Sequence, residues 1–385
     1  MFLNQTVKRN QALIDISFQL QQSGEIEPDS YIVDVDTFLE NASIILSKAK
    51  ENGIHLFFML KQIGRNPYLA KKLTELGYEG AVVVDYKEAQ IMMEQQIPIG
   101  NIGHLVQIPS AQIEKVVAYG PKFITVYSED KIKQINAAAK KLGVIQKILI
   151  RVYQENDMIY SGQTAGFHID DISGLAEKIQ ADYANVAIAG VTSFPCYLFN
   201  RDADDIVPTQ NLQTVLRAAA VLEQAGIHCE MVNTPSATCS RTLEKMKVYG
   251  GNCGEPGHGL TGTTPLHAVY DLEEIPCVTY VSEISHNFMG KAYCFGGGYY
   301  RRSHVEYALV GTNYPDAKLV KVIPPTDESI DYHFGLSEEC EVGDAVVMAF
   351  RYQIFVTRSD VVLVEGLKNT APRIAGIYDS LGREK

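Results

Sequence analysis

Lys61 is the side chain with the clearest potential for chemistry in the first third of the sequence. It directly follows HLFFML (55–60), an apolar run that we expect to form a buried strand. A lysine that is partly desolvated at the end of such a strand has a lowered pKa, and its neutral amine can form a Schiff base with a carbonyl compound. The alternative is a solvated lysine that only caps the strand, which is the commoner role at such a position.

Two segments past the middle of the chain are candidates for binding a phosphate group. They are NTPSAT (233–238) and GEPGHGLTG (254–262). Backbone amides and hydroxyl groups in segments of this kind bind phosphate oxygens, and Ser236, Gly257 and His258 are the residues placed to do so. The alternative is that the glycines of the second segment only turn the chain into another domain.

The elements that would position these groups form a regular pattern. From about residue 31 to 255, short apolar runs alternate with helical patterns, which predicts repeated βα units around a parallel sheet. Nine runs predict an α/β fold, a (β/α)8 TIM-type barrel with one extra strand at its entrance. The active site of such a barrel lies at the C-terminal ends of its strands. Lys61 would then follow the first barrel strand, and the two phosphate-binding candidates would follow the seventh and eighth. The expected strands are 31–36, 55–60, 80–85, 102–106, 123–127, 148–153, 186–192, 230–233 and 252–255.

Two of the intervening helices can be predicted from the spacing of apolar residues. One is expected over 37–53 and the other over 211–226, and each ends at a glycine, as helices commonly do. The buried face of the first helix is expected to contain Leu39, Ala42, Leu46 and Ala49. We expect both apolar stripes to belong to the core rather than to a site.

After about residue 266 the sequence changes to β-rich segments that are separated by turns, which predicts a second, all-β domain. We therefore predict a barrel domain with an N-terminal lead-in over 1–265 and a β domain over 266–385.

The composition excludes several classes of function. A formal net charge of −12 argues against a nucleic-acid partner, because binding phosphate backbones requires a basic face. No apolar run reaches the roughly 18 residues of a membrane span, and the first residues lack the apolar core of a signal peptide. The 7 cysteines are scattered and include no C-x-x-C pair, so neither a disulfide framework nor a zinc site is indicated. We expect a reduced, cytoplasmic enzyme.

Beyond these single features, the sequence resembles the alanine-racemase family of fold-type III pyridoxal-phosphate enzymes over nearly its whole length. The stretch QIFVTRSDVVLV (353–364) is similar to the YhfX-like branch of that family in particular. The resemblance implies a barrel that binds pyridoxal 5'-phosphate, a β domain, and a homodimer with its active site at the subunit interface. The other similar segments, in the family's order, are IVDVDTFLEN (32–41), FMLKQIGRNP (58–67), GYEGAVVVDYKEA (77–89), GVTSFP (190–195), NTPSA (233–237) and GEPGHGLTG (254–262).

The resemblance also implies roles for single residues. Lys61 looks like the lysine that binds the cofactor and returns a proton on one face of the substrate. Arg65 lies where the family often has a phosphate-binding tyrosine, and its charge would contact that phosphate. The residues that match the family's phosphate-binding loops are Asn233, Ser236, Gly257 and His258.

Three positions depart from the family's pattern. Glu255 stands where alanine racemases have an arginine facing the pyridine nitrogen, and a carboxylate there would keep this nitrogen protonated and the cofactor a stronger electron sink. Its EPG context is similar to the basic-amino-acid decarboxylases of the same fold. Ser193 replaces the histidine that packs on the cofactor ring, and His104 is a substitute for it or else an ordinary core histidine. The family's orienting arginine after the fifth strand is missing, and Gln163 stands roughly there.

The second acid/base is expected from the segment KAYCFGGGYYRRSH (291–304) in the β domain of a partner subunit. Tyr293 is similar to the racemase tyrosine that works opposite the lysine, and Cys294 to a cysteine of the decarboxylases. Adjacent residues of a strand point to opposite sides, so only one of the two can face the cofactor, and we favour Tyr293. Arg301 and Arg302 are either substrate-carboxylate ligands or plain surface charges. The β domain lacks the closely spaced His/Cys or His/Asp pair of metal-binding relatives, so we expect no metal.

The leading hypothesis is a pyridoxal-phosphate-dependent amino-acid racemase or epimerase that uses Lys61 and Tyr293 as the two bases at Cα. A decarboxylase built from the same parts is the first alternative, favoured by Glu255 and Cys294. A non-catalytic carrier or regulator of pyridoxal phosphate is the second, although its single-domain relatives lack a β domain. The expected partner is a small-molecule amino-acid substrate; the sequence determines neither its identity nor whether it is an amino acid or a larger amine.

Overall fold

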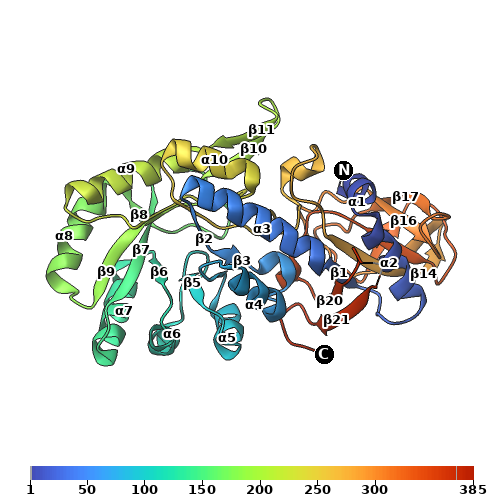
Figure 1. The fold of residues 1–385 in the computed structure, drawn as a ribbon, viewed down its shortest axis with the longest axis horizontal. Helices are drawn as coiled ribbons and strands as arrows, with labels where there is room; N and C mark the ends of the chain where they lie inside the picture. Colours follow the sequence, from blue (N-terminus) through green and yellow to red (C-terminus); the bar gives the residue numbers. More distant parts are fainter. Residues whose placement is uncertain (1, 370) are drawn as a thin grey trace. The chain divides into compact units, whose positions relative to one another are not determined.

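The computed structural model describes residues 2–369 and 371–385, which form two compact units. The barrel unit consists of Ile45–Leu60 and Ala70–Gly257. The β unit consists of Met1–Ile44, Lys61–Leu69 and His258–Lys385. Figure 1 shows how the chain passes through these elements in sequence order.

The barrel unit contains a parallel sheet that closes on itself. Its strand order is β2-β13-β12-β9-β7-β6-β5-β4-β3, and β2 and β3 are the two halves of one extended segment around Phe57. That segment pairs with β13 through His55 and Leu56, and with β4 through Phe58 and Met59. The predicted eight-stranded barrel is thereby confirmed. The bounds are β2 (His55–Leu56), β3 (Phe58–Met59), β4 (Ala81–Val83), β5 (Ile99–Ile102), β6 (Phe123–Val126), β7 (Gln146–Tyr153), β9 (Val186–Thr192), β12 (Met231–Asn233) and β13 (Cys253–Gly254).

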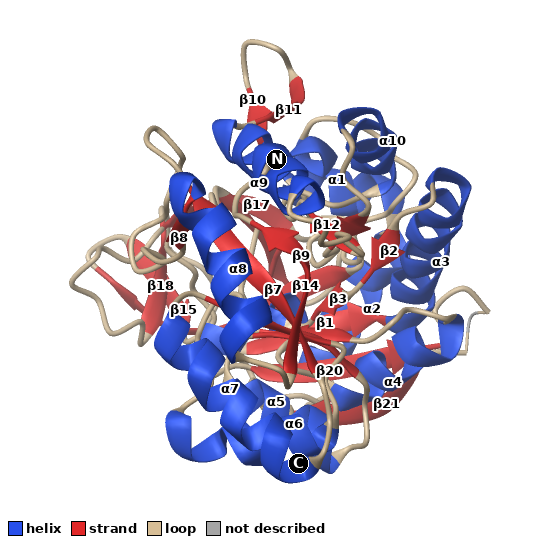
Figure 2. Ribbon diagram, turned by 90° about the vertical axis from the view of Figure 1, so that its left-hand side faces the viewer, coloured by secondary structure: helices blue, strands red, loops and turns tan. Residues whose placement is uncertain are grey.

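Helices alternate with these strands, as Figure 2 shows. They are α4 (Pro67–Leu76), α5 (Tyr86–Glu94), α6 (Ile113–Tyr119), α7 (Glu129–Leu142), α8 (Ile172–Asp182), α9 (Gln210–Gln224) and α10 (Ser240–Tyr249). Two small additions interrupt the pattern: β8 (Phe167–His168) pairs with β7, and a hairpin of β10 (Tyr197–Asn200) and β11 (Asp205–Pro208) follows β9.

Aromatic side chains fill the interior of the barrel unit. The Phe57 and Phe123 rings meet edge to face at 6.0 Å and are fully buried. Gly100 leaves the room for this packing, because a Cβ atom there would stand 2.1 Å from Cδ1 of Phe57. The strand that precedes Lys61 is therefore held in the barrel unit by the packing of Phe57.

The helix predicted over 37–53 is α3 (Val35–Asn52), which begins after Asp34 and ends before Gly53. The Asp34 side chain accepts a hydrogen bond from Thr37 N at 3.1 Å, so it caps the first turn. Its buried face contains Phe38, Ala42, Ile45 and Ala49. Phe38 and Ile45 thus take the places predicted for Leu39 and Leu46, which are half-buried. The larger Phe38 and Ile45 decide the face, because a one-residue rotation buries more apolar surface.

The β unit contains a mostly antiparallel sheet in the order β15-β18-β17-β16-β19-β14-β1-β20-β21. Since β15 also pairs with β14, six of these strands close a second, antiparallel barrel. The predicted all-β fold of this part is confirmed. The bounds are β1 (Ser30–Asp34), β14 (Val278–Phe288), β15 (Lys291–Phe295), β16 (Tyr307–Gly311), β17 (Lys318–Ile323), β18 (His333–Leu336), β19 (Ala345–Met348), β20 (Asp360–Glu365) and β21 (Arg373–Tyr378).

The strand that we predicted at the barrel entrance, 31–36, instead belongs to the β unit as β1. It pairs antiparallel with β14 and parallel with β20. All five of its side chains are buried, so it needs neighbours on both edges and cover on both faces. An apolar run alone does not indicate which sheet will supply these neighbours. In this chain β14 and β20 supply them, and the N-terminal residues therefore belong to the β unit rather than to the barrel.

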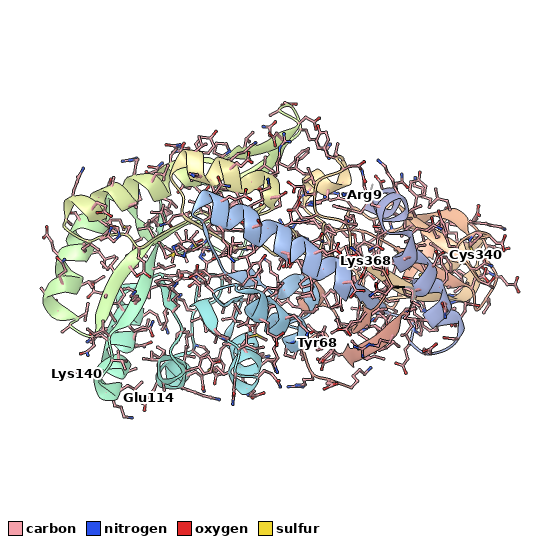
Figure 3. All side chains as sticks on the ribbon, in the orientation of Figure 1. Arg9, Tyr68, Glu114, Lys140, Cys340 and Lys368 are labelled. Carbon is pink, nitrogen blue, oxygen red and sulfur yellow. The ribbon has the colours of Figure 1, made fainter. Side chains whose placement is uncertain are left out.

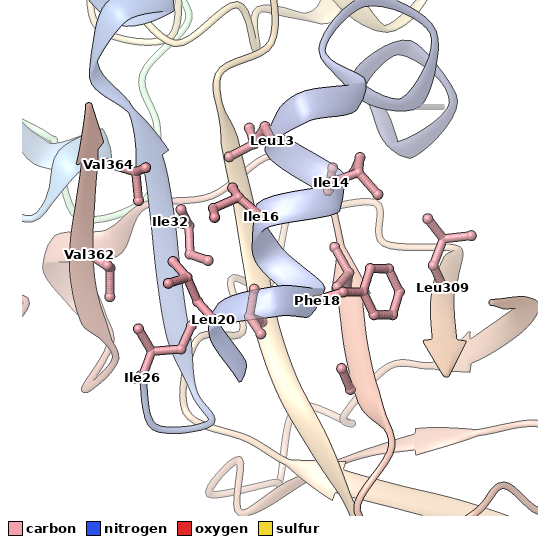
Figure 4. Packing of buried hydrophobic residues seen from close by; sticks show 14 of the residues in the cluster. Leu13, Ile14, Ile16, Phe18, Leu20, Ile26, Ile32, Leu309, Val362 and Val364 are labelled. Atoms are coloured by element: carbon pink, nitrogen blue, oxygen red, sulfur yellow. The ribbon is translucent and has the colours of Figure 1, made fainter. Parts of the chain in front are cut away.

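Two N-terminal helices, α1 (Phe2–Arg9) and α2 (Gln11–Gln22), precede β1. The Asn10 side chain caps α2 by accepting a hydrogen bond from Leu13 N at 3.3 Å. The apolar residues of α2 pack on strands of the β unit. The strand residues that they contact include Ile32, Leu309 and Val362 (Figure 4). Among the residues that the structure describes, no helix combines the length and apolar character of a membrane span.

Candidate active site

The lysine predicted from the sequence stands at the end of the first barrel strand. Lys61 is half-buried and begins a short 3-10 helix, η1 (Lys61–Ile63), two residues beyond the end of β3. Two positions before it, Met59 N donates a hydrogen bond to Pro256 O at 2.9 Å. The strand that leads to Lys61 therefore runs beside the segment that contains Glu255 and Pro256.

The segment that follows Lys61 is an integral part of the β unit. A Cβ atom on Gly64 would stand 2.9 Å from Val361 Cγ2 on β20, so only glycine permits this approach. Tyr68, labelled in Figure 3, donates a hydrogen bond to Glu365. Burial and that bond raise the pKa of Tyr68 to about 12. Tyr68 therefore anchors the segment and remains protonated at neutral pH.

Glu255 and Asn233, both predicted from the sequence, lie together at the C-terminal ends of the barrel strands. Asn233 Nδ2 donates to Glu255 Oε1 at 2.8 Å and to Thr192 Oγ1 at 3.2 Å. Glu255 N in turn donates to Thr238 Oγ1 at 3.2 Å. Thr192 and Thr238 lie within the motifs already noted, but their hydroxyls could be assigned to this cluster only once the strand register was known.

The negative charge of Glu255 acts on two buried thiols nearby. Burial, and then the Glu255 charge, raises the pKa of Cys253 well above its usual value. Burial, then Asp157 and then Glu255, does the same for Cys196. Both cysteines are therefore neutral thiols at physiological pH, and neither is a candidate nucleophile.

The loop after β12 has an unusual backbone where the phosphate site was predicted. Ser236 has a φ of +124° and Ala237 a φ of +50°, and both side chains are half-buried. Such angles are rare for residues other than glycine and are commonest at functional sites. Pro235 O accepts a hydrogen bond from Cys196 N at 3.0 Å, which ties this loop to the segment that follows β9. Gly257 is buried at the end of the neighbouring segment.

His258 is held in the β unit between two polar side chains. Its Nδ1 lies 2.9 Å from Thr263 Oγ1, and its Nε2 lies 3.4 Å from Gln353 Nε2. Burial, followed by the charges of Arg351 and Lys61, keeps the pKa of His258 well below its usual value. The imidazole is therefore neutral at physiological pH, and it can offer a hydrogen bond but no charge to a phosphate.

Arg65 lies four residues after Lys61 and is also part of the β unit. Its side chain is 5% exposed, and its guanidinium lies 5.6 Å from the centre of the Phe355 ring. The residue has a φ of +56°, a conformation that non-glycine residues seldom adopt. Arg65 is thus a buried cation in a strained turn.

His104 and Ser193, predicted to flank the cofactor ring, are both buried in the barrel unit. The His104 ring meets Phe194 edge to face at 6.1 Å, so the aromatic residue after Ser193 touches the histidine directly. Ser193 Oγ accepts a hydrogen bond from Asn211 Nδ2 at 3.1 Å. Ser193 therefore has a structural partner at the start of α9.

The fifth barrel strand carries a buried cation that the sequence did not reveal. Arg151 on β7 is 2% exposed and donates to Gln163 O at 2.8 Å. In the sequence, Gln163 stands roughly where the family has its orienting arginine after this strand. The signal was present within the strand itself, since ILIRVY (148–153) contains one charged residue in an otherwise apolar run.

Tyr293 and Cys294 point to opposite sides of β15, as adjacent strand residues must. Cys294 is fully buried within the β unit, and burial raises the pKa of its thiol to about 12. Tyr293 is half-buried, and its ring stacks on His286 with 5.1 Å between centres and 10° between planes. This placement leaves Tyr293 as the accessible member of the pair. Within residues 2–369 and 371–385, no group of three or more His, Cys, Asp or Glu side chains is arranged to hold a metal ion.

The family models and a curated relative that match this chain all indicate the same family. The model of the alanine racemase N-terminal domain matches residues 33–265, and that of the YhfX-like C-terminal domain matches residues 279–374. The chain is 45% identical over 384 residues to the uncharacterized protein YhfX of Escherichia coli strain K12, covering 99% of each chain.

Solved structures of similar fold include enzymes with different activities. D-threonine aldolase from Filomicrobium marinum matches with a TM-score of 0.68 and 17% identity, over 93% of this chain and 96% of that one. Alanine racemase from Clostridium difficile 630 in complex with cycloserine matches with a TM-score of 0.65 and 17% identity, over 92% and 99%. D-threo-3-hydroxyaspartate dehydratase from Delftia sp. HT23 matches with a TM-score of 0.66 and 13% identity, over 91% and 97%. The chain belongs to the alanine racemase family of fold-type III enzymes and carries the YhfX-like C-terminal domain.

Proposed function

We propose that this protein is a pyridoxal-phosphate-dependent enzyme that racemises or epimerises an amino acid. The observation that carries the proposal is the buried Asn233–Glu255 pair beside the strand that precedes Lys61. A lysine that follows a barrel strand can hold this cofactor covalently, a turn with left-handed backbone can bind its phosphate, and a buried carboxylate would keep its ring nitrogen protonated.

The residues present fit the cofactor chemically. Asn233 Oδ1 is fully buried and has no hydrogen-bond partner in the described part of the chain, which is unusual unless a ligand supplies a donor. Lys61 would hold the cofactor covalently, and Glu255 would keep its ring nitrogen protonated. His104 and Ser193 would flank the ring. The residues that would bind its phosphate are Arg65, Ser236, Gly257 and His258.

When bound, pyridoxal phosphate withdraws electrons from Cα of an attached amino acid and thereby acidifies the Cα–H bond. The chain must then provide one proton acceptor and one proton donor on opposite faces of Cα. We assign the Lys61 amine to one face and the Tyr293 hydroxyl to the other. Tyr293 would come from the β unit of a second subunit, so the functional form would be a homodimer with two shared sites.

A decarboxylase is the alternative that one observation favours. The Glu255 carboxylate matches the group that faces the ring nitrogen in the basic-amino-acid decarboxylases of this fold. The burial of Cys294 argues against this reading, because a thiol with a pKa of about 12 inside the β unit is a poor proton donor or acceptor for a ligand. A carrier without catalytic activity is disfavoured by the complete β unit.

The decisive experiment follows the bond that breaks at Cα. Cofactor-loaded protein is incubated with single D- and L-amino acids in heavy water. The products are separated by chiral chromatography, and their masses are measured by mass spectrometry. A racemase exchanges the Cα hydrogen for deuterium and yields both enantiomers with the carboxylate intact. Release of carbon dioxide with an amine product would replace the racemase reading by the decarboxylase reading.

A further inference from the structure

His286 lies directly beside Tyr293, the residue that we assign to one face of Cα. The two residues pair across β14 and β15, and their rings stack with 5.1 Å between centres and 10° between planes. On the other side of β15, Tyr293 pairs with Gly335 of β18. A glycine presents no side chain, so His286 is the cross-strand neighbour that can fix the ring of Tyr293.

A β-bulge places His286 opposite Tyr293. Ile284 pairs with Cys294, and after an irregularity in the register His286 pairs with Tyr293. Without this irregularity, the antiparallel register would place Ser285 rather than His286 opposite Tyr293. Bulges are common beside active sites, where they redirect a side chain. Here the redirected side chain is an imidazole.

His286 is itself held by two neighbours. Its Nδ1 lies 3.0 Å from Ser285 Oγ. The His333 ring meets it edge to face, with 5.1 Å between ring centres. Burial, and then the nearness of His286, lowers the pKa of His333 below its usual value. His333 is therefore neutral at physiological pH, and its ring can contact the second imidazole without charge repulsion.

The hydroxyl group of Tyr293 is left available. In the part of the chain that the structure describes, this hydroxyl forms no hydrogen bond, so packing against the ring determines where it lies. An acid/base group must come within about 2.6–3.2 Å of its partner atom, and a displacement of about 1 Å can cost about a hundredfold in rate. A stack that fixes the plane of the phenol ring therefore orients the hydroxyl without occupying it.

We propose that His286 is a positioning residue for proton transfer by Tyr293. The inference rests on the proposed function and deepens it, because the second subunit then contributes a pair of rings rather than a single tyrosine. The Tyr293 hydroxyl donates its proton to one face of Cα while the Lys61 amine accepts the Cα proton on the other face. In the reverse direction the two groups exchange these roles, so the protein gains one proton and loses one in each inversion.

The experiment measures two reactions of single enantiomers in heavy water. Inversion at Cα needs both Lys61 and Tyr293, whereas exchange of the Cα hydrogen with retention needs only the group on one face. Each enantiomer is tested in turn, and the one that presents its hydrogen to Lys61 should keep the exchange when Tyr293 is misplaced. A cross-strand ring pair also stabilises a sheet, and a purely stabilising pair would not change the ratio of these two reactions.

Three variants are compared with the wild type. His286→Ala removes the ring at an exposed position, and His286→Phe keeps a flat ring there. His228→Ala, which removes an exposed histidine of the barrel unit, is the control. We expect His286→Ala to slow inversion by about two- to tenfold and to leave exchange with retention unchanged. His286→Phe should invert at nearly the wild-type rate, and His228→Ala should not differ from the wild type.

A second measurement needs neither cofactor nor substrate. 3-Fluorotyrosine in place of Tyr293 gives a fluorine NMR resonance whose position depends on the ring stacked beside it. His286→Ala should move this resonance, and His286→Phe should keep it close to its original position. If His286→Ala does not fold, His286→Gln replaces it, because it also lacks a ring.

Three results would overturn the inference. The first is a folded His286→Ala protein that inverts at the wild-type rate, and the second is an equal loss of inversion and of exchange with retention. The third is a fluorine resonance at position 293 that does not respond to His286→Ala. A wild type that neither inverts nor exchanges any amino acid would instead refute the proposed function, and the fluorine resonance would still show whether the stack forms.

Discussion

At the scale of single residues, the Asn233 amide contributes to the orientation of Glu255. Asn233 Nδ2 bridges Glu255 and Thr192, so a side chain on the seventh barrel strand aligns the carboxylate that follows the eighth. A carboxylate held in this way is preorganised, and little reorganisation is needed when charge develops on a ligand. The contribution of Glu255 should therefore appear in the chemical step rather than in cofactor affinity.

The variant Glu255→Gln tests this expectation. The amide keeps the size of the side chain but lacks the charge that would hold the ring nitrogen protonated. We expect kcat for Cα proton exchange to fall by about ten- to a hundredfold, with a much smaller change in the dissociation constant of pyridoxal phosphate. Asp271→Asn, which removes an exposed carboxylate from the β unit, serves as the control. Unchanged turnover would show that Glu255 faces away from the ligand.

Lys61 is tested by trapping. Borohydride reduction of cofactor-loaded protein, followed by peptide mass spectrometry, should place the reduced adduct on Lys61. Lys61→Ala should lose both the adduct and the visible absorption, whereas Lys71→Ala, an exposed lysine of α4, should keep both. An adduct on any other lysine would contradict the assignment.

The sequence predicted where some reactive side chains lie along the strands, whereas their roles at the site stay predictions. The sequence placed Lys61, Asn233 and Glu255 at strand ends, and the structure has them there. Arg151 was missed because a charge within a strand gives no sign of which face it occupies. Only the closed barrel shows that this face is the interior, and the register of β7 with β9 shows which residues share its layer.

At the scale of elements, the loop after β15 is fixed by close contacts with its glycines. A Cβ atom on Gly297 would stand 1.9 Å from Asp29 Oδ2, and one on Gly298 would stand 2.3 Å from a carbon of the Tyr280 ring. Asp29 Oδ1 accepts hydrogen bonds from Tyr280 at 2.9 Å and from Ser359 at 2.5 Å. The sequence showed the three glycines but not their partners, which come from distant parts of the chain.

The pH dependence of stability should report on Asp29. Burial raises the pKa of Asp29 from 3.8 to about 6, although hydrogen bonds from Ser359 and Tyr280 and the charge of Arg358 oppose the rise. Because the folded state holds this proton more tightly than the unfolded state, the stabilisation is complete below pH 3.8 and is lost as pH rises through 6.

The corresponding variant is Asp29→Asn, which cannot titrate. Between pH 4 and pH 7, its free energy of unfolding should rise relative to that of the wild type by about 1–3 kcal/mol. Urea unfolding at several pH values measures this difference. Asp15→Asn, an exposed site on α2, is the control and should show no such trend. A difference that stays constant with pH would mean that Asp29 is ionised throughout.

At the scale of the whole molecule, the β unit exposes apolar side chains near Tyr293. Phe295 on β15 is 38% exposed, and Ile330 and Tyr332, just before β18, are 62% and 64% exposed. Exposed apolar side chains that gather in one region are typical of surfaces that bind another protein. They support the proposal that Tyr293 serves a site in a second subunit.

Subunit complementation tests the shared site. Lys61→Ala and Tyr293→Phe should each be inactive alone, and a mixture that exchanges subunits should recover about a quarter of wild-type activity, because half of the dimers then contain one intact site of two. Mixing Lys61→Ala with Glu255→Gln should recover nothing, since both changes lie in the half of the site that one subunit contributes. Absence of recovery, after exchange is verified by mass, would indicate sites contained in single chains.

The position of β1 governs the order in which the chain can fold during translation. The ribosome releases β1 before any residue of the barrel unit, whereas its partners β14 and β20 emerge only after the barrel is complete. Until then β1 and the apolar side of α2, which includes Leu13, Ile16 and Leu20, have no native surface to cover them. Nascent chains with exposed apolar segments are substrates for chaperones and proteases. A prematurely terminated chain that lacks β20 therefore keeps part of its N-terminal segment uncovered and open to degradation.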